Sequence, residues 1–94
     1  MYIISLTYKV PVETIDPFLA EHVSYLEEYY TSGVFLLSGR KVPRTGGVII
    51  ARAENMESVL EIIKKDPFHV HDFADYEITE IVPSKAHKDL QFLI

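Results

Sequence analysis

Cysteine is absent from the 94-residue chain, and basic residues are fewer than acidic ones. The lack of cysteine excludes disulfide bonds, thiolate nucleophiles and cysteine-ligated zinc or iron–sulfur sites. No apolar run reaches the ~18–20 residues that span a bilayer, and no charged region precedes the first apolar stretch. We therefore expect no membrane segment, no signal peptide and a cytoplasmic location.

The charge balance argues against nucleic acid as a partner. Nine Lys and Arg residues against fourteen Asp and Glu residues give a net charge of −5, which repels a phosphate backbone. Apolar residues make up 48% of the chain and charged residues 24%, as in ordinary globular proteins. This length predicts one domain, residues 1–94, and a small core favours a homo-oligomer as additional stabilisation.

Hydrophobic periodicity predicts four strands and two helices in the order βαββαβ. We expect the first helix to be capped by Asp16 before Pro17, or to start nearer Glu13, and to end at Gly33. We expect Asn55 to cap the second helix, which must end at residue 65 or 66 before Pro67. The strands are expected at residues 1–10, 34–38, 48–53 and 73–83, with a long hairpin loop at residues 39–47.

This order is the ferredoxin-like α+β arrangement, an antiparallel sheet with both helices on one face. The other face has no cover of its own, and the strand at 34–38 is apolar on both sides. We expect a second copy to cover it, giving a homodimer or higher homo-oligomer. The tail, residues 84–94, ends in four apolar side chains out of its last five, and we expect it to dock on the domain or on the partner subunit.

Four histidines are candidate chemical groups, and three of them carry little signal. His69 and His71 form an H-x-H pair beside Asp72, which would need a third ligand to hold a metal. We expect this pair to lie in a loop, exposed to solvent, and His87 to be exposed in the tail. The sequence therefore predicts no metal site, and no motif indicates a cofactor.

His22 differs because it lies in the apolar stripe of the first helix, between Leu19 and Leu26. The two helices run antiparallel in this topology, so Asp66 at the end of the second helix should lie close to His22. A carboxylate fixes the tautomer of a histidine and raises its basicity, as a general base requires. The alternative is a structural pair that anchors one helix to the other, and the pattern alone favours this alternative.

The hairpin loop is locally basic. Arg40 directly follows the strand end and Gly39, so it is the better candidate for binding an anion. Lys41 and Arg44 are expected to be solvated residues at the tip.

The sequence resembles the YCII-related family over nearly its whole length. The resemblance rests on FLAEHVSYL around His22, on GVFLLSGR, on the glycine pair at 46–47, and on the D-P-F motif at Asp66 followed by ADYEITEIVP. It implies a ferredoxin-like chain that pairs its sheets into a dimeric α+β barrel. It also implies an active-site pair of His22 and Asp66. Family members often have proline after the serine and glycine, where this chain has Arg40.

The resemblance implies proton-transfer chemistry on a small, cyclic or anionic substrate, of the lyase or isomerase kind and without a cofactor. In this hypothesis His22 is the general acid or base and Asp66 orients it, while Ser38 and Arg40 hold oxygen atoms of the substrate. Aromatic Tyr8 and Phe68 would line the ring pocket. The alternative is a non-catalytic domain that binds a small ligand or mediates oligomer contacts, because a fold does not determine a function.

Overall fold

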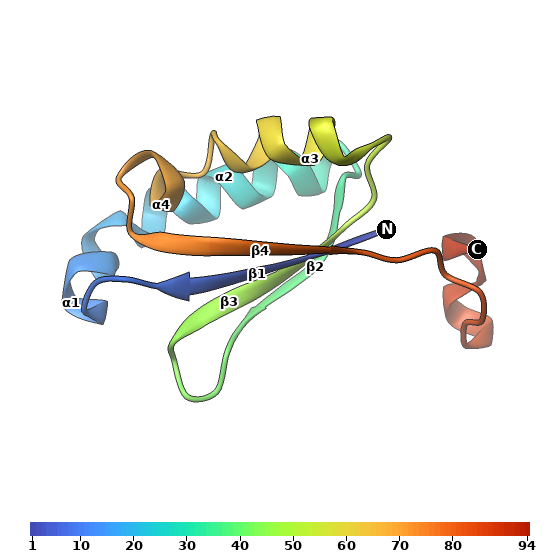
Figure 1. Ribbon diagram of the computed structural model, residues 1–94, viewed down its shortest axis with the longest axis horizontal. Coiled ribbons are helices and arrows are strands. Elements are labelled where there is room, and N and C mark those ends of the chain that lie inside the picture. The colour runs from blue at the N-terminus through green and yellow to red at the C-terminus, as the bar shows by residue number, and fades with distance from the viewer.

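Four antiparallel strands form one sheet in the order β2-β3-β1-β4, and α2, α3 and α4 lie on one of its faces (Figure 1). The computed structural model describes residues 1–94. The ferredoxin-like prediction is confirmed. The strands are β1 (Tyr2–Tyr8), β2 (Phe35–Arg40), β3 (Gly46–Ala51) and β4 (Ala74–Glu80), and the helices are α1 (Val12–Ile15), η1 (Asp16–Phe18), α2 (Leu19–Thr31), α3 (Met56–Ile63), α4 (Pro67–Val70) and η2 (Lys88–Leu93).

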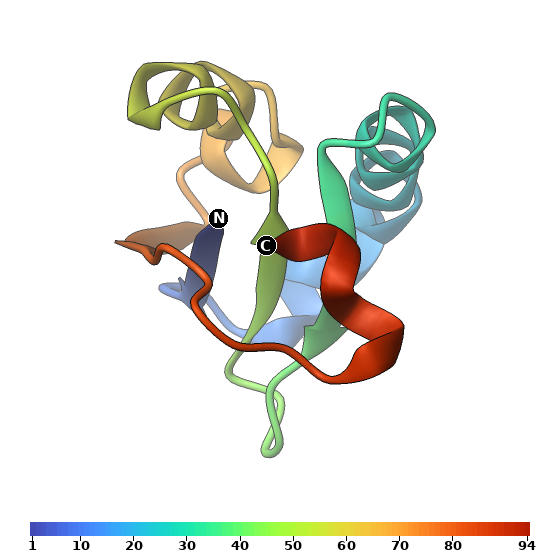
Figure 2. The same cartoon turned by 90° about the vertical axis from the view of Figure 1, so that its right-hand side faces the viewer.

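The core lies between the sheet and the helices, which form two layers in the view along the strands (Figure 2). Alternate residues of β1, namely Tyr2, Ile4 and Leu6, are buried on the helix side, because successive side chains of a strand point to opposite faces. Val59 and Ile63 of α3 pack against them from above. No helix covers the opposite face of the sheet, which the figures show open.

The first helical region starts earlier than the expected cap at Asp16 and is interrupted there. It begins at Val12, close to the alternative start near Glu13, and Asp16 lies inside the 3₁₀ turn η1 with no capping hydrogen bond. The cap assignment is therefore wrong. The glycine end is confirmed, since Gly33 has φ +85° and the backbone N–H groups of residues 33 and 34 bond the carbonyls of 30 and 29.

Two apolar side chains of α2 remain partly exposed. Leu19 and Val23 keep 36% and 49% of their surface accessible, whereas Tyr25 is buried. The buried stripe of α2 is therefore narrower than the spacing of its apolar residues suggests, because only one side of the helix packs against the sheet.

The hairpin loop is shorter than predicted. Strand β2 runs on through Gly39 to Arg40 and β3 begins at Gly46, so the loop is residues 41–45 and not 39–47. Gly39 and Gly46 are strand residues. Gly46 lies directly against β1. A Cβ atom on Gly46 would lie 1.8 Å from the backbone oxygen of Leu6. Here glycine marks a close backbone approach inside the sheet and not a turn.

The second helix carries the predicted cap and then breaks. The side chain of Asn55 accepts a hydrogen bond from the N–H of Ser58, which confirms the cap. The helix α3 ends at Ile63, and a further turn, α4, follows with Pro67 at its start. His69 thus lies in a helical turn and not in the expected loop, while His71 closes that turn.

The C-terminal tail extends past the end of the sheet (Figure 1). Leu90, Phe92 and Ile94 are exposed by 46%, 59% and 60%, and Leu93 lines a shallow groove that includes Met1 and Val34. Its docking remains a prediction. None of the helices is both long and apolar enough to span a membrane.

Candidate functional site

A pocket of about 370 Å³ lies between α2 and the helix-facing side of the sheet. Five of the six residues predicted for the site line it, and the sixth, Asp66, lies directly behind His22. The lining residues are Leu6, Tyr8, Leu19, His22, Leu26, Ser38, Gly39, Arg40, Arg44, Gly46, Gly47, Val48, Ile49 and Phe68.

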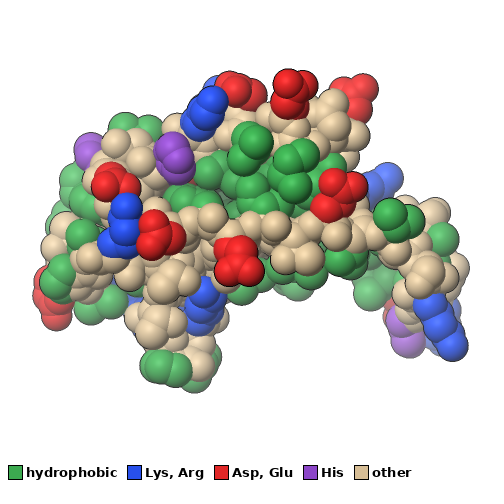
Figure 3. All heavy atoms as spheres, viewed as in Figure 1, with side chains coloured by type: hydrophobic (Ala, Val, Ile, Leu, Met, Phe, Trp, Pro, Cys, Tyr) green, Lys and Arg blue, Asp and Glu red, His purple; other side chains and the backbone are tan.

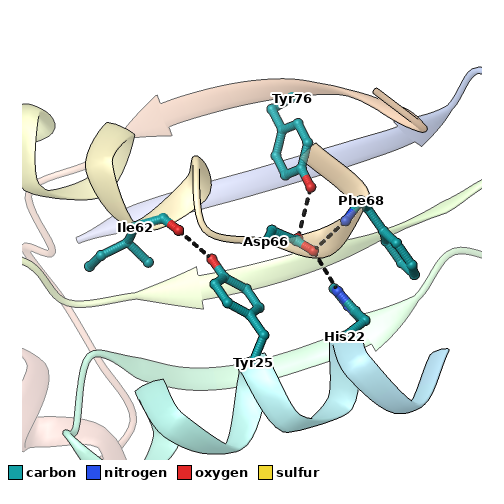
Figure 4. Close-up of polar contacts among 6 residues, drawn as sticks. All are labelled: His22, Tyr25, Ile62, Asp66, Phe68 and Tyr76. Atoms are coloured by element: carbon teal, nitrogen blue, oxygen red, sulfur yellow. Dashed lines mark hydrogen bonds and ion pairs between the residues drawn. The ribbon is translucent and has the colours of Figure 1, made fainter. Parts of the chain in front are cut away.

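His22 and Asp66 contact each other directly. The distance between His22 Nδ1 and Asp66 Oδ1 is 2.9 Å, so the two helices do bring this pair together (Figure 4). The His22 side chain is 14% exposed and that of Asp66 is 0% exposed. The imidazole is therefore the member of the pair that a ligand can reach.

Three donors satisfy the buried Asp66 carboxylate. Oδ1 accepts hydrogen bonds from His22 and from the backbone N–H of Phe68 at 3.0 Å, while Oδ2 accepts from the Tyr76 hydroxyl at 2.7 Å. The bond from Phe68 also makes Asp66 the N-cap of α4, with Pro67 in the first helical position. The D-P-F motif thus fixes the carboxylate by local geometry, and burying a charge requires such partners.

Tyr76 was not predicted from the sequence as part of this network. It lies on β4, and its ring also lines a second groove beside Leu60, Ile63 and Ile78. Hydrophobic side chains gather in this region, between α3 and β4 (Figure 3). Burial, followed by the neighbouring Asp66 carboxylate, raises the pKa of Tyr76 above its ordinary value, so its hydroxyl keeps its proton to a higher pH than that of a free tyrosine.

Aromatic rings set the orientation of the His22 imidazole. The ring stacks on Phe68, with centroids 4.1 Å apart and planes 7° from parallel. On its other side, Tyr25 lies with its centroid 6.1 Å away. The Tyr25 hydroxyl donates to the carbonyl of Ile62 at 2.8 Å and makes no hydrogen bond with Asp66. Burial is the main cause that raises the pKa of Tyr25, and Asp66 adds to it.

The second ring nitrogen of His22 is free. A carboxylate can only accept, so Nδ1 carries the hydrogen of the bond to Asp66 and Nε2 of the neutral ring has a lone pair. Nε2 makes no hydrogen bond within the chain. Every side-chain nitrogen or oxygen that is fully buried has a hydrogen-bond partner, so an unbonded Nε2 cannot be among the buried atoms. Nε2 is therefore accessible, and it can accept or return a proton at the pocket.

Strand register places the polar candidates of β2 on the pocket side. Ser38 pairs with Ile49 and Arg40 with Gly47, and both partners face the helices. The Ser38 hydroxyl is 2.5 Å from that of Tyr30 on α2, a partner that the sequence did not indicate. Alternate residues of a strand share a face. Since only Gly39 separates Ser38 from Arg40, both side chains point toward the pocket.

The other histidines lie away from this pocket. No cluster of three or more His, Asp or Glu side chains could hold a metal ion, so no third ligand joins His69 and His71.

The two cations of the hairpin loop have different surroundings. The Lys41 ammonium group donates to the Thr7 hydroxyl at 3.1 Å. Arg44, in contrast, lines the pocket and pairs with Asp16, so the expectation that it is merely solvated at the hairpin tip is wrong.

The YCII-related domain family matches residues 1–82. The chain belongs to the YCII-related family. The fold of this YCII-related protein is similar to that of 5-chloro-2-hydroxyhydroquinone dehydrochlorinase (TftG) from Burkholderia phenoliruptrix AC1100, in its complex with 2,5-dihydroxybenzoquinone. The two structures share 18% sequence identity with a TM-score of 0.72, over 86% of this chain and 93% of the other. The likeness supports the α+β fold of the chain described above. No protein of curated function matches the sequence significantly.

Proposed function

We propose that this YCII-related protein is a small enzyme that transfers protons on a small cyclic or anionic substrate without a cofactor. His22 is the general acid or base, acting through Nε2, and Asp66 orients the ring and stabilises its protonated form. Ser38 and Arg40 hold oxygen atoms of the substrate, and Tyr8 and Phe68 contact its ring. The reaction is of the lyase or isomerase kind.

One observation carries this proposal. A histidine with one nitrogen at a pocket has its other nitrogen on a carboxylate that is fully buried and held by two further donors. A purely structural pair needs no free nitrogen at a pocket surface. The neighbour of similar fold is a dehydrochlorinase in complex with a dihydroxyquinone, which supports the choice of hydroxylated rings as first substrates.

The test is turnover by the wild-type protein and by His22→Gln. We expect 5-chloro-2-hydroxyhydroquinone, or a related hydroxylated ring in a panel, to react under catalytic amounts of protein, with chloride release or the absorbance of the quinone as the readout. Removing a general acid or base should reduce kcat by roughly 10²–10⁴-fold. Asp66→Asn should also reduce kcat, because the amide cannot stabilise the imidazolium.

His87→Gln is the matched control, since it removes a histidine that lies in the exposed tail. It should retain wild-type turnover. NMR signals of the His22 ring that shift on addition of 2,5-dihydroxybenzoquinone, without turnover of any ring in the panel, would reject the enzyme and support the non-catalytic ligand-binding alternative. Equal turnover by the wild type and His22→Gln would reject the role of His22.

We further propose a homodimer formed through the open face of the sheet. Ile3, Val48 and Ile50 on that face are only half-buried in the single chain, and Leu37 of β2 is 64% exposed. Together these side chains form an apolar surface on β1, β2 and β3, on the face of the sheet that no helix covers. Such a surface is more stable against a second copy than in water.

Light scattering coupled to size exclusion tests the dimer. The wild type should have twice the mass of one chain, and Leu37→Glu should shift it to the mass of one chain. Val23→Glu is the matched control, because Val23 is 49% exposed on α2, on the other side of the sheet. A monomeric wild type, or the same mass for both variants, would refute this interface.

A further inference from the structure

The lining of the pocket has a charge opposite to that of the protein. The chain has a net charge of −5, yet the pocket lining includes Arg40 and Arg44 and no Asp or Glu residue. Composition alone would place acids there more often than bases. The chain therefore concentrates positive charge at this pocket, and planar guanidinium groups bind carboxylates and similar planar anions well.

Arg44 is held at the pocket by an ion pair between two separate segments. Its Nη2 donates to Asp16 Oδ1 at 2.6 Å, which links the hairpin loop to η1, the turn that leads into α2. Asp16 is not part of the lining, so its carboxylate fixes the guanidinium from outside the pocket. A pair this exposed contributes little to stability, but it positions the arginine.

Arg44 also retains donors for a ligand. A guanidinium has five N–H groups, and the bond to Asp16 uses one of them. The neighbouring cation of the same loop, Lys41, has a different environment. Its ammonium group bonds Thr7, whose side chain is on the open side of the sheet, and Lys41 does not line the pocket. The loop thus directs one of its two cations to the pocket.

We propose that Arg44 is a second anion-binding residue of this pocket, which selects ring ligands that have a carboxylate or another acidic oxygen. This inference rests on the proposed function and adds a specificity residue to it. Arg40 ends β2 and Arg44 lies in the loop that follows it, so the ligand lies against the hairpin while the His22 ring reaches it from α2. Neutral rings of the same shape bind more weakly, because they offer the donors of Arg40 and the unused donors of Arg44 no anionic group.

Benzoate and benzamide test this selection, because they have nearly the same shape and differ in charge. Their dissociation constants are measured by NMR titration in low salt. For the wild type we expect benzoate to bind about ten-fold or more tightly than benzamide, as a hydrogen bond to a charged group implies. Arg44→Gln should lose most of this preference by weakening benzoate alone, and Arg44→Lys should retain part of it.

Lys41→Gln is the matched control, since it removes the same charge from the same loop. It should leave both dissociation constants unchanged, and thermal melts should show that each variant is folded. The inference is overturned if benzoate does not bind, if its preference survives Arg44→Gln, or if Lys41→Gln has the same effect as Arg44→Gln. Failure of the proposed function looks different: benzoate binds through Arg44, while no ring is turned over.

Discussion

Replacing Tyr76 by Phe removes one hydroxyl from the buried end of the His22 and Asp66 network. The ring remains to fill its place on β4, so the packing of the side chain changes little. The loss falls on Asp66 Oδ2, whose hydrogen bond from Tyr76 is 2.7 Å long. Because the Asp66 side chain is 0% exposed, water cannot readily replace the missing donor.

The size of the effect follows from the charge of the acceptor. A hydrogen bond to a charged group contributes about 1.5–3 kcal/mol, whereas one between neutral groups contributes about 0.5–1.5 kcal/mol. Tyr25→Phe is therefore a matched control, since its hydroxyl bonds the neutral carbonyl of Ile62 at 2.8 Å. We expect Tyr76→Phe to lower the free energy of unfolding by about 2 kcal/mol, and Tyr25→Phe by about 1 kcal/mol.

Urea denaturation followed by circular dichroism measures both values, and thermal melts give an independent check. For a domain of this size, each kcal/mol corresponds to about 4–8 °C in Tm. The reasoning is refuted if Tyr76→Phe costs no more than Tyr25→Phe. It is also refuted if Tyr76→Phe is as stable as the wild type, because the carboxylate would then not need the hydroxyl.

Three other predictions concern stability. The raised pKa values of Tyr25 and Tyr76 mean that the unfolded chain loses these protons first, so the free energy of unfolding should fall as the pH rises above about 10; urea melts should show a shallower fall for Tyr76→Phe, and a parallel curve would contradict it. Gly46→Ala should cost about 1–3 kcal/mol in the same assay because its Cβ would lie 1.8 Å from a backbone oxygen of β1, whereas Gly39→Ala, with open space around it, should cost much less. Asn55→Ala should lower the free energy of unfolding by about 1 kcal/mol through loss of the cap, and an unchanged urea midpoint would show that the cap is dispensable.

The sequence predicted local features correctly where a single residue determines them. Asn55 caps a helix through its own amide, and Gly33 ends one because glycine adopts a positive φ at no steric cost. Patterns whose meaning depends on segments distant in the sequence led to wrong predictions. Gly39 and Gly46 looked like a loop, although they are strand residues, and the reason for glycine at Gly46 is the backbone of β1, which is distant in sequence.

The site shows the same division. Periodicity put His22 on the inner side of a helix, and topology put Asp66 near it, so the pair was predictable as a contact. The donor from Tyr76 to Asp66 Oδ2 and the partner of Ser38, Tyr30, were not predictable. Each joins elements whose distance depends on how the helices sit on the sheet, and a tyrosine in an alternating strand or helix has the same pattern with or without a buried partner.

The order of the elements, the face of the sheet that receives the helices and the types of residue available for chemistry follow from the amino-acid sequence, because they depend on periodicity and on short-range backbone preferences. The remaining features of the site depend on how the segments pack together. This packing places Arg44 against the pocket through Asp16, and it leaves Nε2 of His22 free while Nδ1 is bonded to a buried carboxylate. These outcomes depend on distances between segments far apart in the chain, which only packing sets.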